Sequence, residues 1–208
     1  MLRTHPYMFA NLPVLALLLA ITLFTRRRDL ARLALPSGFL CLPASVLALM
    51  HQGEYWRPNR LGGGSFGIED LVFTFSAGMV AWYCAAWPHR AVVLPDRIVT
   101  WRGVKRTLIW GTASGALALV LWRSGLDCMS ATVMAAIPLL AALLGRRRRL
   151  WRLAFTGLVC FVPVYIALVS IQLAVWPDYL RQWSSGGWTR IILGMPAGEI
   201  AWAAAFQG

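Results

Sequence analysis

The hydrophobic pattern divides the chain into long apolar runs separated by short polar segments. We place these runs at residues 7–24, 30–50, 68–87, 108–122, 129–144 and 153–176, with a seventh from 196 to the end. A bilayer-spanning helix needs about 20 apolar residues. The pattern therefore predicts an all-α fold, a polytopic membrane bundle of about seven spans. The fourth run is short, and Arg106 and Arg123 beside it could extend to the interface.

Two stretches of the chain resemble each other. Arg26-Arg27-Arg28 and the residues after it align without a gap with the arginines that begin at Arg146, and Pro43 falls on Pro163 at the same offset. Asp70 aligns with Glu199 if the second copy has nine additional residues in the loop before its third helix. This repeat predicts two parallel three-helix units joined by a connector span, a 3-1-3 arrangement. We place the units at residues 1–100 and 129–208, with the connector at 101–128.

The formal net charge of +12 comes from 20 basic residues against 8 acidic ones. By the predicted topology, 14 of the 20 basic residues lie on one side of the membrane, which the positive-inside rule assigns to the cytoplasm. We therefore expect an integral protein of a bacterial cytoplasmic membrane with its N-terminus outside and its first span retained. Membrane orientation explains the basic residues first, so we expect no nucleic-acid partner.

The four cysteines and three histidines show no metal-ligand spacing, so we expect no metal and no cofactor. The seventh run has only 13 residues from Pro196, about 20 Å of helix against a core of about 30 Å. We expect either a helix that stops half-way or a shortened version of a longer protein. The oligomeric state stays open.

The candidate chemistry lies in three acids, Glu69, Asp70 and Glu199, each in the first turn of an apolar helix. One interpretation is structural, since acids there cap free amides and favour the helix dipole. The other is functional, because acids at membrane depth usually have a function and both repeats carry one. Burial would raise their pKa and make them proton donors near neutral pH.

Adjacent residues on a helix point in different directions, so we expect Asp70, which aligns with Glu199, to form a shared site with it. Glu69 would then tune their pKa. Aromatic side chains follow the acids in both repeats, at Phe73, Phe75 and Trp202. Their π-faces could stabilise a cation in a dry cavity, although lipid contact or packing is the more common explanation for any one of them.

These motifs resemble those of the membrane-embedded lycopene cyclases, the heterodimeric bacterial and fused fungal type. That family has two three-helix repeats with a Pro-x-Glu-Glu/Asp signature at the third helix of each. The matching residues are Gly67-Ile68-Glu69-Asp70 and Pro196-Ala197-Gly198-Glu199, with Gly67 in place of the proline and Gly198 in place of the first acid. The resemblance implies cyclisation of the ends of a linear carotenoid by Glu69, Asp70 and Glu199, without a flavin domain. The implied partners are membrane lipid and an apolar isoprenoid substrate.

Two other functions fit parts of the pattern. Parallel 3-1-3 repeats also build small-solute transporters, so a non-catalytic relative that carries a solute or binds lipid or carotenoid remains an alternative. A retinal-binding photoreceptor would also have seven spans. It needs a lysine in mid-membrane, whereas Lys105 lies in a predicted basic loop.

Overall fold

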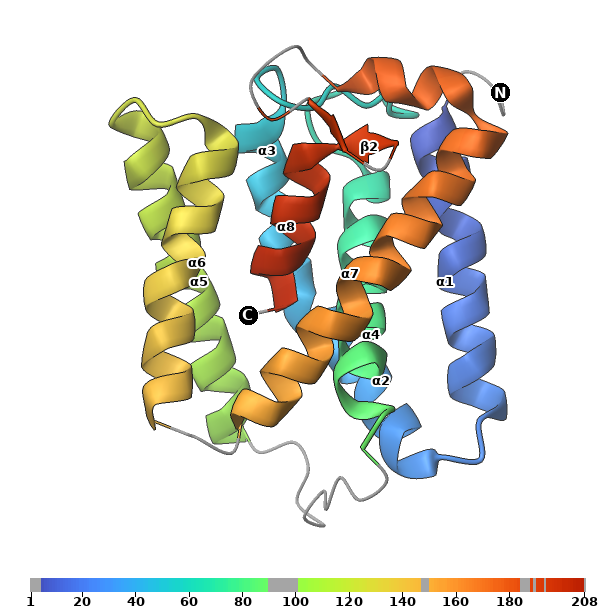
Figure 1. Cartoon of the computed structure of the whole chain (residues 1–208), viewed down its shortest axis with the longest axis vertical. Coiled ribbons are helices and arrows are strands. Elements are labelled where there is room, and N and C mark those ends of the chain that lie inside the picture. The colour runs from blue at the N-terminus through green and yellow to red at the C-terminus, as the bar shows by residue number, and fades with distance from the viewer. Residues whose placement is uncertain are drawn as a thin grey trace.

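The computed structural model in Figure 1 describes residues 5–89, 101–146, 150–183, 188, 190–192 and 194–207. The chain is mostly helical. Its helices are α1 (Pro6–Phe24), α2 (Arg28–Cys41), α3 (Ala48–His51), α4 (Ile68–Ala86), α5 (Trp101–Arg123), α6 (Cys128–Arg146), α7 (Leu150–Val175) and α8 (Ala197–Gln207). Two 3₁₀ helices, η1 (Leu42–Leu47) and η2 (Pro177–Gln182), and a hairpin of β1 (Ile191–Ile192) and β2 (Met195–Pro196) complete the described elements.

Among the described residues, four helical segments are long and apolar enough to cross a membrane: α1, the run Arg28–His51, α6 and α7. The predicted helical fold class is therefore confirmed, and these four segments fit a membrane protein. Helices α4 and α5 are also long, with 19 and 23 residues, but their first turns carry charges that lower their hydropathy. The last helix, α8, has 11 residues.

Several predicted boundaries were wrong. The second apolar run is not one α-helix, because the backbone tightens into η1 around Pro43, which cannot donate a backbone hydrogen bond. Helix α5 starts at Trp101, so Arg102, Lys105 and Arg106 lie in a helix rather than in a loop. Pro196 belongs to β2, where it pairs with Ile191, and the helix starts one residue later. A hairpin in this loop was not predicted.

Helix α4 lies at the centre of the bundle, against α1 and α2 on one side and α7 on the other. Helix α8 packs against α6 and α7, while α5 pairs with α6 at the edge. The α2–α4 contact is close because Gly78 has no side chain: a Cβ there would lie 2.7 Å from both the Ser37 carbonyl oxygen and Cys41 Sγ. The predicted unit boundary near residue 100 and the basic residues Arg90, Arg97 and 147–149 lie outside the described residues.

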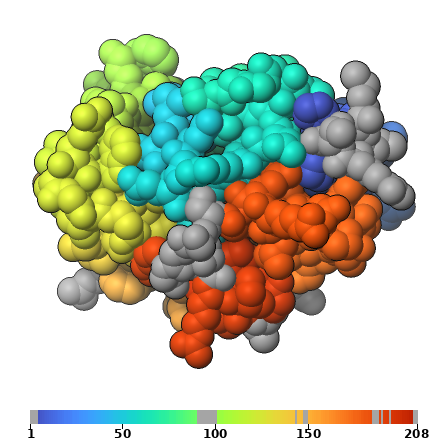
Figure 2. Space-filling view, turned by 90° about the horizontal axis from the view of Figure 1, so that it is seen from above, coloured from blue at the N-terminus to red at the C-terminus, as the bar shows by residue number. Residues whose placement is uncertain are grey.

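One end of the bundle is covered by two segments. The first is the loop between α3 and α4, and the second is η2, which follows α7; they lie side by side in the view from above (Figure 2). The Arg57 amide donates to the Gln182 carbonyl at 2.6 Å, and Trp56 forms a β-bridge with Trp183. Backbone hydrogen bonds therefore tie the two segments into one roof over the first turns of α4 and α8.

Candidate functional site

Asp70 is in the first turn of α4, at the roofed end of the bundle. Its Oδ2 accepts a hydrogen bond from the Gly67 amide at 2.8 Å, which satisfies a free backbone donor at the helix start. The capping function expected of these acids is therefore present at Asp70.

Asp70 also forms a buried ion pair with Arg60. Arg60 Nε lies 2.8 Å from Oδ2 and Nη2 lies 3.0 Å from Oδ1, and both side chains are 1% exposed. The Tyr7 hydroxyl donates to Oδ1 at 3.4 Å. A guanidinium cannot accept a proton, so this two-point contact favours the ionised carboxylate. Arg60 was not among the partners expected for Asp70 from the sequence.

Glu69 points away from Asp70, as the helical geometry requires. It is 1% exposed, and its Oε1 accepts from the Leu61 amide at 2.5 Å. A Cβ on Gly67 would lie 2.2 Å from Glu69 Oε2, so the carboxylate occupies space that a side chain at position 67 would take. Glu69 anchors the loop before α4 and is not among the residues that line the cavity described below.

Glu199 is in the first turn of α8 and has a different environment. The Tyr165 hydroxyl of α7 donates to Oε2, and Trp183 Nε1 donates to Oε1 at 2.8 Å. Among the described residues, no arginine or lysine pairs with Glu199. Two carboxylates at equivalent helix starts therefore have unlike partners, a cation at Asp70 and neutral donors at Glu199.

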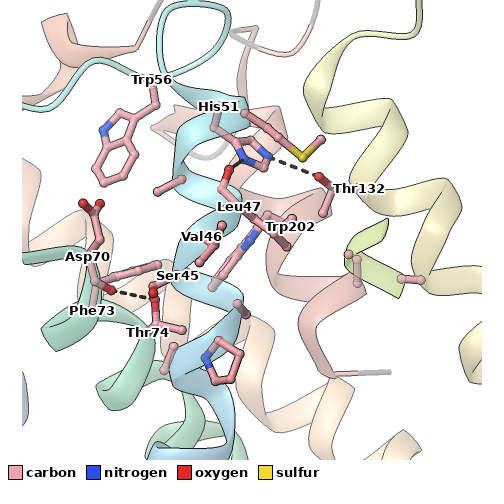
Figure 3. Close-up of a pocket in the computed structure, with 18 of the residues that line it drawn as sticks. Ser45, Val46, Leu47, His51, Trp56, Asp70, Phe73, Thr74, Thr132 and Trp202 are labelled. Carbon is pink, nitrogen blue, oxygen red and sulfur yellow. Dashed lines mark hydrogen bonds between the residues drawn. The ribbon is translucent and has the colours of Figure 1, made fainter. Parts of the chain in front are cut away.

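Asp70 and Glu199 line the same cavity, which has a volume of about 930 Å³. The cavity lies between α4, α7 and α8 on one side and η1, α3, α5 and α6 on the other. Figure 3 shows Asp70, Phe73 and Thr74 on one wall and Trp202, His51 and Thr132 on another. Most of the lining side chains are apolar, so the cavity suits an apolar ligand.

A chain of aromatic rings connects the two acids along the cavity wall. The ring centroids of Phe73 in α4 and Trp202 in α8 lie 5.4 Å apart. Those of Trp202 and Tyr165 are also 5.4 Å apart, and the Tyr165 hydroxyl hydrogen-bonds Glu199. Toward Asp70, the Tyr7 ring lies 6.1 Å from Phe73 and 4.4 Å from Trp56. The structure thus brings Phe73 and Trp202 together from the two halves of the chain.

Phe75 lies elsewhere. Its ring packs against Phe39 at 5.1 Å and against Gly38, where a Cβ would lie 2.7 Å from the ring. It is not among the residues that line the cavity. A two-residue step on a helix turns the side chain by about 200°, so Phe73 and Phe75 face opposite sides of α4.

The cavity reaches the side of the bundle between η1 and α5. Val46 and Leu49 line it from one edge, and Leu108 and Leu119 from the other. All four are exposed, Val46 by 58%. Because these residues belong both to the cavity lining and to the surface of the bundle, the cavity opens at the side of the bundle.

Several residues of the site were not identified from the sequence. Arg60, Tyr55 and Trp183 come from loops, and Tyr165 lies within an apolar helix. Their spacing to the acids has no motif, since they approach Asp70 and Glu199 only when the loops fold over the bundle. One feature of the sequence could have indicated a partner: Arg60 lies in the predicted outer-face loop that leads to Asp70.

In the ranges that the structure covers, no cluster of three or more His, Cys, Asp or Glu side chains could hold a metal ion. Comparison with known proteins adds nothing to the geometry, because no protein-family model, curated protein or solved structure matches the chain.

Proposed function

We propose that this protein is a carotenoid end-group cyclase of the lycopene type that works by acid–base catalysis within the membrane. The observation that carries the proposal is that Asp70 and Glu199, from two different helices, line one apolar cavity yet have unlike partners. Two acids in one site can take different roles when their environments differ, one transferring protons and the other staying charged.

Glu199 would be the proton donor. Its partner Trp183 can only donate, but the Tyr165 hydroxyl can donate to a carboxylate or accept from a carboxylic acid. With no cation paired to it among the described residues, Glu199 has surroundings that suit both protonation states. A group that gives up a proton and later regains one needs such surroundings.

Asp70 would act as a fixed negative charge. Protonation of a terminal double bond by Glu199 forms a C–H bond and leaves a carbocation. The electrons of a neighbouring double bond then close the ring and move the positive charge to a ring carbon. The Glu199 carboxylate takes a proton from the adjacent carbon, and the C–H electrons form a new double bond. No atom is gained or lost, and Asp70, held ionised by Arg60, opposes the transient charge.

The aromatic rings support the same assignment. Phe73, Trp202 and Tyr165 face the cavity between the two acids. The face of an aromatic ring attracts a cation, by about 2 kcal/mol or more in a dry site. Together they would stabilise the carbocation along the path between Glu199 and Asp70.

We also propose the 3-1-3 arrangement, in which the 11-residue α8 takes the place of the seventh span, with the acids at the outer face and the N-terminus outside. In support, α4 packs against α1 and α2 as α8 packs against α6 and α7. The starts of α2, α5 and α7 and the end of α6 lie at the end of the bundle opposite the roof (Figure 1). These helix ends carry Arg28, Arg102, Arg152 and Arg146, which agrees with the positive-inside rule.

The test is expression in cells that make lycopene. We expect the wild-type protein to produce cyclised pigment, Glu199→Gln to produce none, and Phe75→Leu, outside the cavity, to behave as wild type. Unchanged lycopene with the wild-type protein present in the membrane would contradict the proposal. Pigment that co-purifies with the protein in unconverted form would favour the alternative, a non-catalytic carotenoid-binding protein.

A further inference from the structure

Among the described residues, the hydroxyl of Tyr55 has no hydrogen-bond partner, although the residue is only 5% exposed. Tyr55 is in the loop between α3 and α4 and lines the same cavity as Glu199. A buried polar group without a partner costs about 1–3 kcal/mol. Such a group within an apolar cavity calls for a functional explanation.

Gly198 fixes the position of this hydroxyl. A Cβ at residue 198 would lie 2.5 Å from Tyr55 Oη and 2.6 Å from Cζ. The tyrosine ring therefore rests directly on the first turn of α8, one residue before Glu199. Only glycine allows this approach, so the space beside Gly198 is filled by the phenol of Tyr55.

We propose that Tyr55 is a positioning residue for Glu199, which accepts a hydrogen bond from the protonated carboxyl and donates one to the carboxylate. The proposal rests on the proposed function, in which Glu199 alternates between the two states. Rotation of the phenolic O–H changes the role of the oxygen without moving the ring. Because no hydrogen bond fixes this hydroxyl within the described part of the chain, its O–H can rotate between the two roles.

The surroundings keep Tyr55 in the neutral form that this role requires. Burial raises the pKa of Tyr55, and the nearby Glu199 carboxylate raises it further. Tyr55 therefore retains its proton throughout the physiological range and acts as a hydrogen-bond partner rather than as an acid. Trp183, in contrast, can only donate and so serves the carboxylate alone.

Infrared difference spectroscopy of the purified protein in lipid tests this role directly, because a protonated carboxyl has a C=O stretch that its hydrogen bonds shift. Glu199→Gln identifies the band of Glu199 by removing it. We expect Tyr55→Phe to shift that band and to lower the rate of cyclisation about tenfold, as the loss of about 1.4 kcal/mol from one hydrogen bond implies. Gly198→Ala should have a similar effect, since it displaces the ring and leaves the hydroxyl in the protein.

Tyr83→Phe is the matched control. Tyr83 is also buried, and its hydroxyl bonds Thr22 at 2.8 Å, but it does not line the cavity. It should leave both the band and the rate as in wild type. If the wild-type protein cyclises lycopene and shows the Glu199 band, but Tyr55→Phe changes neither, the role of Tyr55 is overturned and the proposed function stands. If no cyclisation occurs in wild type, the proposed function itself fails.

Discussion

Arg60 and Asp70 form a two-point ion pair in which both side chains are almost completely shielded from solvent. Arg60 also donates to Gln52 Oε1 at 3.1 Å, so its charge is spread over several acceptors. The pair joins the loop before α4 to the first turn of that helix. It therefore fixes the roof of the cavity and the charge of one of its acids at the same time.

Arg60→Gln should destabilise the protein strongly, because it leaves the Asp70 carboxylate buried without its cation. Breaking a buried pair costs about 3–5 kcal/mol. Thermal unfolding in detergent, followed by circular dichroism, would measure the loss. Arg57→Gln is the control. Arg57 is exposed, and within the described residues its side chain bonds the Gly53 carbonyl alone, so its replacement should change stability by less than about 0.5 kcal/mol.

Gly78→Ala should weaken the α2–α4 contact, because the new Cβ would meet the Ser37 carbonyl oxygen at 2.7 Å and backbone cannot move aside easily. Overpacking of this kind costs about 1–3 kcal/mol. Gly115→Ala on α5 is the matched substitution, since a Cβ there meets nothing within 4 Å. It should be neutral or slightly stabilising in the same unfolding measurement. Equal effects at the two positions would contradict the packing described for α2 and α4.

Trp202→Leu should lower the rate of cyclisation about 30-fold, as the loss of about 2 kcal/mol of cation–π stabilisation implies, while the variant still retains pigment. Leucine keeps the apolar character of the wall and removes the π-face, together with part of the side-chain volume and the indole N–H. Pigment bound per protein and product formed per hour separate the two effects. Loss of both in parallel would instead indicate that Trp202 shapes the cavity without acting on the cation.

Asp127, which does not line the cavity, should make the stability of the fold depend on pH. Its Oδ1 accepts from the Ser130 amide at 2.9 Å at the start of α6. Desolvation alone would raise the pKa of Asp127, but the hydrogen bonds from Ser130 outweigh it and hold the pKa below its usual value. Because the pKa of Asp127 is lower in the folded state, its cap contributes its full stabilisation above the unfolded pKa, near 4. That stabilisation is lost as the pH falls through the pKa of the folded state.

We therefore expect Asp127→Ala to lose about 1 kcal/mol at pH 7, the usual value of an N-cap. The difference from wild type should shrink below pH 4. Asp127→Asn keeps a capping oxygen that does not titrate, so it should stay close to wild type at pH 7 and lose less stability on acidification. Melting curves between pH 3 and pH 7 would show both trends. A wild-type curve parallel to that of Asp127→Asn would contradict the assignment.

The proposed orientation can be read from cysteine labelling in intact cells. Asn59→Cys, in the roof loop, should react with a membrane-impermeant maleimide added outside. Arg102→Cys, in the first turn of α5, should react only after the membrane is opened. Both residues are exposed in the bundle, so access to the reagent depends on the side of the membrane. The reverse labelling pattern would place the N-terminus inside.

The membrane class and the positions of most helices follow from the sequence because long apolar runs have few alternatives to a helix in a bilayer. The distinction between η1 and an α-helix did not follow, since it depends on how the turns around Pro43 pack against α4 and α5. Helix α5 was predicted too short because its first turns are polar, and hydropathy does not show that a polar segment continues a helix.

Some residues of the site could be predicted from the sequence and others could not. The repeat brought Asp70 and Glu199 into one hypothesis, and both acids line the cavity. Helical periodicity could have separated Phe73 from Phe75, which face opposite sides of α4. Arg60, Tyr55 and Trp183 could not be found, because their contacts depend on the path of two loops that have no regular pattern. Arg60 was not expected as the partner of Asp70 for that reason.

The roof over α4 and α8 and the side opening between η1 and α5 together decide how a ligand arrives. Backbone bonds close one end of the bundle, whereas Val46 and Leu119 border the side opening. In the proposed membrane arrangement the closed end would face water and the side opening would face the acyl chains. Occupancy would then follow how strongly a compound partitions into the bilayer, not how well it dissolves in the medium. An assay with free substrate in detergent would measure extraction from the micelle as much as affinity for the protein.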